Sequence, residues 1–366
     1  MLRLLSVLAS GFVAIAPAAA APVTDCPLRD APYSTSSPLI DILLNPRAKA
    51  VLEGDRPGAL DMAPPQLMGT NPPTFAAILS VREALGFTGG DPAALPAIDA
   101  KLRAIPVTAA DKVARCARYD NEVPRFALPA GQPRLLLFEK INGFKDVPSV
   151  EAAHAALVAM AQRKGWALVV TDKGGAFNPA TLKQFDAVIW NNISGDVLTL
   201  AQRSAFQQYL ANGGGFVGVH GSGGDPVYFW DWYPDTLLGA RFAGHPMSPQ
   251  FQDARIVADP KHPLAGAVPR EWVMKDEWYS FKSNPRQAGA KVLLTLDEST
   301  YAQAGPRGTN LSMGADHPIA WTKCIGKGRM FYSAIGHLPE TYSHPNYVAL
   351  LEAAIPWVSD KATACR

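Results

Sequence analysis

The feature that most constrains the fold is an alternation of short apolar strands with amphipathic helices, which begins after Pro133. "RLLLFEKI" (134–141) is typical of a strand, and "SVEAAHAALVAMAQRKG" (149–165) is typical of a helix that begins at a serine and ends at a glycine. The cycle repeats through "WALVVTDK", "DAVIWNNI" and "TLAQRSAFQQYLANGG". Elements in this order predict an α/β fold with a mostly parallel, doubly wound sheet that helices cover on both faces.

Residues 22–132, ahead of this pattern, are rich in proline and alanine and carry only short helical patterns. In "TFAAILSVREAL" (74–85) the apolar residues recur on one face of a helix. We therefore expect a small N-terminal helical module, followed by an α/β domain over residues 133–366. No group of acids, bases or nucleophiles gathers in the module, so we expect it to be dispensable for chemistry.

The first 21 residues have the order of a secretory signal peptide. Arg3 precedes the apolar run Leu4–Ala16, and small residues follow up to Ala21. The apolar run is shorter than the roughly 20 residues that span a bilayer. We expect cleavage near Ala21 and a periplasmic or secreted protein with no membrane attachment after cleavage.

Four cysteines in an exported chain favour disulfides, because the compartment is oxidising. Four cysteines permit three pairings. Cys26 and Cys116 both lie in the N-terminal region, whereas Cys324 and Cys365 flank the last strand and helix, so we favour these two pairs. No C-x-x-C spacing indicates a structural zinc site.

The charge of the chain argues against a nucleic-acid partner. The formal net charge is +2, and no run of lysine or arginine forms a basic stripe. We expect a small molecule as the partner.

A histidine ends the apolar strand in "GGGFVGVHGSGG" (213–224). Ligands of α/β sheets bind beyond the carboxyl ends of the strands, so His220 is a candidate site residue. Gly213, Gly215 and Gly218 match the spacing of a dinucleotide-binding loop, but they precede and enter the strand instead of opening a helix after it. We therefore do not expect a nicotinamide cofactor.

Two further segments supply candidate acids and bases. In "DEWYSF" (276–281), Glu277 and Tyr279 alternate along a strand and so point to one face. His337 ends "FYSAIGH", another apolar strand with a polar end. We predict His220, Glu277, His337 and Tyr279 as catalytic residues. A structural histidine or a surface carboxylate would produce the same local patterns, so the prediction depends on whether these side chains converge.

The segment from Pro133 to about Asp360 resembles the ThuA (trehalose utilisation) family. The resemblance is carried by "GGGFVGVHGSGG", "WDWYPDTLLGARFAGHP" (230–246), "DEWYSF" with "NPR" (284–286), and "HPIAW…GKGRMFYSAIGH" (317–337). It implies a flavodoxin-like fold similar to that of class I glutamine amidotransferases. Those relatives have a cysteine nucleophile where this chain has His220, so glutamine hydrolysis is not expected.

The resemblance also implies an enzyme of carbohydrate utilisation, which acts on glycosides or keto-sugar derivatives by acid/base chemistry. Family members often carry a Phe-Arg-His-like segment after the first strand, and here it reads Phe144-Lys145-Asp146. The cation is kept and the histidine is absent. The alternative is therefore a non-catalytic carbohydrate-binding or accessory protein on an amidotransferase-like scaffold.

Polar and aromatic residues in these motifs and at neighbouring strand ends are candidates for binding the sugar, because aromatic faces stack on sugar rings and polar groups bond the hydroxyls. The expected substrate-binding residues are Lys145, Asp146, Asn192, Trp232, Tyr233, His245, Asn284 and Arg286.

A metal is not assigned from the sequence. His220, Glu277 and His337 could hold a divalent ion such as zinc if they meet at one point, and His245 could join them. Their separation along the chain provides no local ligand signature, and no cofactor motif is present.

Overall fold

The computed structural model describes residues 22–54, 58–363 and 365. The expected signal peptide, residues 1–21, and its cleavage site lie outside the described residues. In the part of the chain that is described, no helix is long and apolar enough to cross a membrane.

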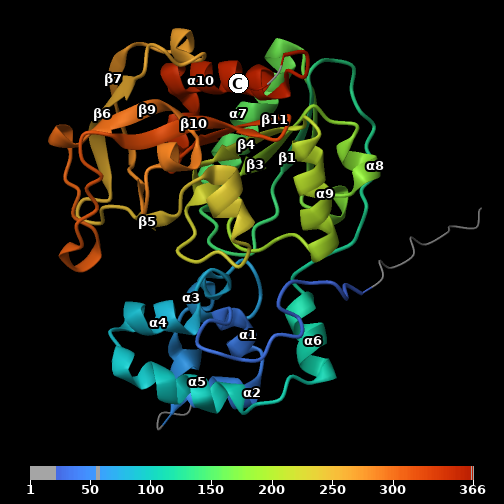
Figure 1. Ribbon diagram of the computed structural model, residues 1–366, viewed down its shortest axis with the longest axis vertical. Coiled ribbons are helices and arrows are strands. Elements are labelled where there is room, and N and C mark those ends of the chain that lie inside the picture. Colours follow the sequence, from blue (N-terminus) through green and yellow to red (C-terminus); the bar gives the residue numbers. More distant parts are fainter. Residues whose placement is uncertain (1–21, 55–57, 364, 366) are drawn as a thin grey trace, which may run out of the picture.

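Six helices lie close together in the N-terminal part of the chain, at the bottom of Figure 1. They are Leu39–Leu43 (α1), Pro46–Glu53 (α2), Pro65–Met68 (α3), Val81–Thr88 (α4), Leu95–Arg103 (α5) and Ala109–Cys116 (α6). They enclose a small apolar core of their own, which includes Ile40, Ile42 and Leu102.

The single helix expected over residues 74–85 is divided in two. Phe75–Ala77 form a short 3-10 helix (η2), and α4 begins only at Val81. The division has a local cause, because Thr74 and Ser80 each accept hydrogen bonds from the backbone amides that follow them and so act as two separate N-caps.

The main sheet has nine strands in the order β2-β1-β3-β4-β11-β10-β9-β6-β7. Their bounds are Arg134–Phe138 (β1), Ala167–Thr171 (β2), Ala187–Asn191 (β3), Gly215–Val219 (β4), Phe251–Ala258 (β6), Glu271–Glu277 (β7), Lys291–Asp297 (β9), His317–Ile325 (β10) and Gly328–Ser333 (β11). A separate pair is formed by Phe242–Gly244 (β5) and Ser280–Phe281 (β8).

The sheet is mixed, so the expectation of a mostly parallel sheet is right for only part of it. Strands β2, β1, β3, β4 and β11 are parallel, whereas β11, β10, β9, β6 and β7 pair antiparallel. The antiparallel strands follow one another without long crossover helices. In β7, exposed and buried residues alternate over most of the strand, which is typical of a strand that is covered on one face.

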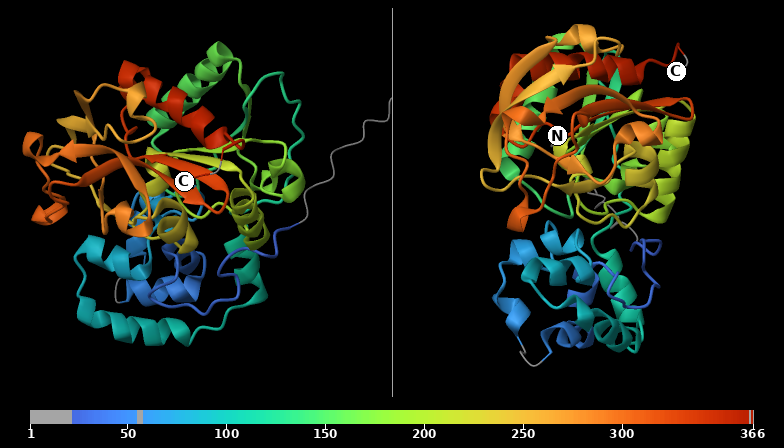
Figure 2. Two further views of the ribbon diagram at one scale, coloured as in Figure 1. Left: turned by 45° about the horizontal axis from the view of Figure 1, so that its top comes forward. Right: turned by 60° about the vertical axis from the view of Figure 1, so that its left-hand side comes forward.

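Four helices accompany the parallel strands: Val147–Lys164 (α7), Pro179–Leu182 (α8), Leu200–Ala211 (α9) and Pro345–Ser359 (α10). Helices α7 and α10 lie on one side of the sheet and α9 on the other (Figure 2). As expected, α9 begins at a capping box of Thr199 and Gln202, and α7 ends at Gly165. Helix α7 begins earlier than expected, at Val147, because Asp146 caps it by accepting from the Ser149 amide.

The N-terminal helices lie against the carboxyl ends of the parallel strands. The Thr74 amide donates to the carbonyl of Asn142, just after β1, at 3.0 Å. Lys140 pairs with Asp120 at 2.8 Å. The edge of the sheet at which α/β proteins bind ligands is therefore covered by the first third of the chain.

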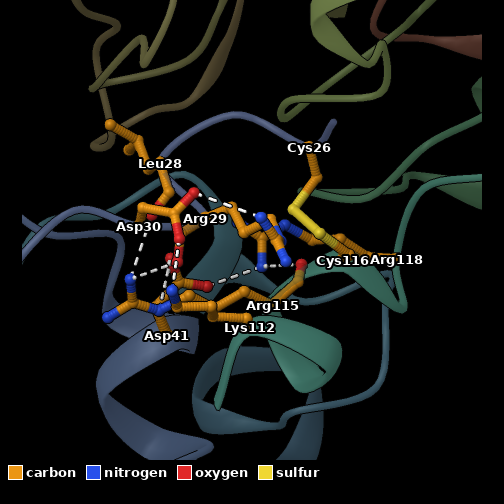
Figure 3. The surroundings of a disulfide bond; sticks show 9 residues. All are labelled: Cys26, Leu28, Arg29, Asp30, Asp41, Lys112, Arg115, Cys116 and Arg118. Carbon is orange, nitrogen blue, oxygen red and sulfur yellow. Dashed lines mark hydrogen bonds and ion pairs between the residues drawn. A yellow bond between two sulfur atoms is a disulfide. The ribbon is translucent and has the colours of Figure 1, made fainter. Parts of the chain in front are cut away.

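Both expected disulfides are present. Cys26 pairs with Cys116, and Cys324 pairs with Cys365. Figure 3 shows that the first bond lies beside a buried ionic cluster, in which Arg118 pairs with Asp41 at 2.6 Å. Two disulfides fit a protein of an oxidising compartment.

Candidate active site

His220 stands at a sharp turn directly after β4. Its φ of 36° lies in the left-handed region, which residues other than glycine rarely occupy. The hydroxyl of Tyr332 donates to the His220 carbonyl at 2.8 Å, and the Asn192 side chain accepts from the Gly221 amide at 3.0 Å. Neighbouring strands therefore hold the turn in this conformation, as is common at functional sites.

Four predicted catalytic side chains converge at this turn. His220 Nε2 lies 3.2 Å from His337 Nδ1 and 3.6 Å from Glu277 Oε2. His337 Nδ1 and Glu277 Oε2 are 3.0 Å apart. The Tyr279 hydroxyl reaches His220 Nε2 at 3.0 Å. Glu277 and Tyr279 thus point the same way, as the alternation along their segment indicates.

The hydrogen bonds assign the tautomer of His220. Its Nδ1 lies 2.7 Å from the Ala334 carbonyl, which can only accept, so Nδ1 carries the proton. Nε2 is then free to accept from Tyr279. Burial lowers the pKa of His220 to about 3, so the ring is neutral at physiological pH.

His337 and Glu277 form a charged pair. Burial opposes the charge on both groups, but their mutual hydrogen bond and the charges around them together outweigh it. The pKa of Glu277 falls to about 2, and the pKa of His337 rises above its ordinary value. Glu277 is therefore a carboxylate at neutral pH, and His337 is the histidine of this cluster that can gain and lose a proton.

The second oxygen of Glu277 is also occupied. Gln250 donates to Oε1 at 2.5 Å, and His245 Nδ1 lies 3.2 Å from the same oxygen. Sequence reasoning did not identify Gln250, because a lone glutamine before a strand carries no signal of its own.

Asp276 is a second functional residue that sequence reasoning missed. It is fully buried and accepts from the amides of Gly336 (2.8 Å), His337 (3.0 Å) and Leu338 (3.2 Å). The Thr341 hydroxyl donates to it at 2.8 Å. Asp276 therefore fixes the loop that carries His337. An acid directly before the predicted Glu277 was the available signal.

The cluster opens into a cavity of about 480 Å³. His220, Glu277, Tyr279, His337, His245, Asn192 and Asp146 all line it. The N-terminal region forms one wall of the cavity, which includes Phe75, Ile78 and Phe87. Residues 22–132 thus help to line the cavity through side chains that are neither acids nor bases, and the expectation that they are dispensable for chemistry stays a prediction.

Asp146 ends the segment Phe144-Lys145-Asp146, in which the family resemblance implied a histidine. Its Oδ2 caps α7 through Ser149 and lies 3.9 Å from His337 Nε2. The carboxylate thus faces the imidazole nitrogen that Glu277 does not contact. Phe144, from the same segment, also lines the cavity.

Five expected substrate-binding residues do not line this cavity. Lys145 is exposed to solvent. Trp232 stacks on Trp230, and Tyr233 is buried against Trp190. These two belong to an aromatic core, because both lie in the π-helix Trp232–Leu238 (η6), which packs against β10 and β11. Asn284 and Arg286 instead both bind Asp316.

The geometry of the cluster would also suit a metal ion. One ligand atom each from His220, Glu277 and His337 lies within 4.8 Å of the others. Atoms that bind zinc tetrahedrally at about 2.0–2.1 Å lie about 3.3 Å apart, close to the separations found here. The bond from His220 Nδ1 to Ala334 is of the kind that orients metal-binding histidines.

The fold and the site define an α/β protein with a strand-end histidine, an acid and a second histidine at the carboxyl edge of its sheet. The sequence profile of the ThuA family, described as trehalose utilisation, matches residues 134–358. The match covers more than half of the chain, and the chain therefore belongs to the ThuA family.

One solved structure, the first of the three that follow, agrees with this assignment. A ThuA-like protein from Bacteroides uniformis is 27% identical with a TM-score of 0.55, and the match covers 66% of this chain and 98% of that one. A ThuA-like protein from Parabacteroides merdae is 15% identical with a TM-score of 0.45, covering 64% and 92%. A β-galactosidase from Bacillus circulans is 13% identical with a TM-score of 0.37, covering 62% and 31%, which is too distant for a functional argument. No curated protein gives a significant match.

Proposed function

We propose that this chain is an exported enzyme of carbohydrate utilisation that acts on glycosides or keto-sugar derivatives by acid/base chemistry. The observation that carries the proposal is the convergence of His220, Glu277, His337 and Tyr279 in one cavity, with separations of 3.0 to 3.6 Å. The family description, trehalose utilisation, supports the substrate class.

Keto-sugar chemistry requires a proton to move beside a carbonyl and the resulting enediolate charge to be stabilised. His337 is the proton carrier in this proposal, because Glu277 keeps its imidazole readily protonated and orients it. Burial keeps the Tyr279 phenol protonated by raising its pKa well above the ordinary value, so its one proton can turn from His220 to developing negative charge. His220, held neutral, positions that phenol as a polar clamp.

The test is incubation of the purified protein with trehalose, other glucosides and their 3-keto forms, followed by product analysis. We expect His337→Ala, His220→Ala and Glu277→Gln each to lower kcat by roughly 100-fold, the usual size of a general acid or base effect. His154→Ala is the matched control, because His154 lies on α7, pairs with Glu139 and does not line the cavity. Full turnover in all three variants would contradict the proposal.

A binding-only protein is the second candidate. It is favoured by Asp146, which stands where relatives often have a histidine. Tight binding of a sugar without any product from any of these substrates would favour this candidate.

A further inference from the structure

One wall of the cavity is a row of aromatic rings that sequence analysis did not assign. The ring of Phe75 lies 6.2 Å from that of Phe87 and 6.2 Å from that of Phe144. Phe144 in turn lies 6.5 Å from the imidazole of His337. The row therefore runs from the N-terminal helices to the proton carrier.

Two of these rings are unusually open to solvent. Phe87 is 55% exposed and Phe144 is 49% exposed, and they are the two phenylalanines counted as exposed in the described part of the chain. Both line the cavity, as does Met247, which is 46% exposed. Exposed apolar surface gathered beside a polar site is typical of a ligand-binding wall.

The wall is held in place from two sides. The Arg307 guanidinium donates to the carbonyls of Gly86 at 2.9 Å and Phe87 at 2.7 Å, at the end of α4. On the other side, a Cβ atom added to Gly143 would lie 2.5 Å from a methyl carbon of Ile78, so the two segments are in close contact. The rings are thus attached to both parts of the chain.

The chemistry around the rings indicates what they bind. The same cavity is lined by Ile78, Pro306, Leu311 and Met247, which offer no hydrogen-bonding side chains for sugar hydroxyls. The polar side chains Asp146, Asn192, Glu277 and His337 also line it, and His337 lies at the end of the aromatic row. The cavity therefore offers polar groups that suit a sugar and, beside them, apolar surface that suits an apolar ring.

We propose that Phe75, Phe87 and Phe144 form a subsite for the apolar ring of a glycoside's leaving group, beside His337. The inference rests on the proposed function and narrows its substrate class to glycosides with a planar, apolar aglycone. Because the subsite is built partly from residues 75–87, the N-terminal region determines specificity although it supplies no catalytic group.

The experiment measures dissociation constants by NMR titration of the full mature chain. The probes are phenyl glucoside and methyl glucoside, each as both anomers, and benzyl alcohol as the isolated ring. The variants are Phe87→Ala, Phe144→Ala and the milder Phe87→Leu. Leu200→Ala is the matched control, because Leu200 is 53% exposed on α9 and does not line the cavity.

We expect the wild-type chain to bind phenyl glucoside about tenfold more tightly than methyl glucoside, the scale of a favourable aromatic contact. Both alanine variants should lose most of this preference while methyl glucoside binding stays unchanged. Equal binding of the two glucosides by the wild type, or an unchanged preference in the variants, overturns the subsite but not the proposed function. Binding of benzyl alcohol that requires Phe87, without binding of either glucoside, supports the subsite and contradicts the proposed function. Absence of all binding overturns both.

Discussion

At the scale of single residues, two histidines 3.2 Å apart acquire opposite properties from their surroundings. His220 is deeply buried, and burial lowers its pKa to about 3, although the hydrogen bond from its Nδ1 to the Ala334 carbonyl favours the charged ring. His337 is bonded to the Glu277 carboxylate, which raises its pKa. Residue type therefore made both histidines candidates, and environment separated the neutral clamp from the proton carrier.

This separation predicts the effect of Glu277→Gln on His337. Removal of the carboxylate should lower the pKa of His337, which NMR titration of its ring protons in chelator-treated protein would measure. The pair contributes its full stability between pH 4.5, the ordinary pKa of glutamate, and pH 6.5, the ordinary pKa of histidine. This contribution is lost as the pH rises through the raised pKa of His337. The variant's loss of stability should thus be largest in that window. An unchanged His337 titration would contradict the assignment.

The same cluster predicts a capacity to bind zinc. Because the three ligand atoms already have suitable separations, we expect calorimetric titration of the chelator-treated protein to show one zinc ion bound. His220→Ala and His337→Ala should abolish binding, and the control His154→Ala should not. Absence of binding in the wild type would contradict the prediction. Loss of turnover with chelator and its recovery with zinc would assign charge stabilisation to the ion.

At the scale of elements, strand β7 contributes two adjacent residues to the site, and their side chains point in opposite directions. Glu277 enters the cavity, and Asp276 binds the loop between β11 and the 3-10 helix Pro339–Ser343 (η11). The position of the loop that carries His337 therefore depends on β7, the edge strand of the antiparallel part of the sheet.

Asp276→Ala should therefore disorder this loop. It removes the acceptor of three loop amides and the Thr341 hydroxyl, so we expect the free energy of unfolding to fall by roughly 3 kcal/mol. Denaturant unfolding measures this loss. Thr341→Val, which removes one donor, should have a smaller effect. Equal stability of Asp276→Ala and the wild type would show that the loop is held by other contacts.

At the scale of the whole molecule, the first third of the chain lies against the α/β part (Figures 1 and 2). Side chains from both line one cavity. The Cys26–Cys116 bond closes the N-terminal region, and the Asp25 carbonyl just before it accepts from the Leu200 amide of α9. The disulfide therefore helps to tie the covering helices to the sheet.

Replacement of both Cys26 and Cys116 by serine should reduce stability by about 2 to 4 kcal/mol, the usual value for a native disulfide. Because the covering helices carry Phe87, binding of phenyl glucoside should weaken as well. Thermal unfolding and NMR titration measure the two effects. The wild-type protein should show no free thiol by mass spectrometry before reduction, and four titratable thiols under denaturing conditions would contradict both bonds.

Much of this protein follows from its sequence, because strand and helix periodicity, caps and strand-end polar residues are local patterns. These patterns predicted the strands around His220 and His337 and the capping box of α9, and the positions of the four cysteines along the chain predicted both disulfide pairs. Glu277 and Tyr279 could also be predicted from the sequence, because both lie in one continuous family motif, DEWYSF (276–281).

The tertiary structure decided what depends on contacts between distant segments. The antiparallel half of the sheet, the anchoring role of Asp276 and the aromatic wall all join residues far apart in sequence. Trp232 and Tyr233 were expected to bind the substrate but pack in the core. The sequence of an aromatic cluster is the same whether the rings contact a ligand or the core. Only packing distinguishes these cases, since burial and hydrogen-bond partners are properties of the folded chain and not of any single segment.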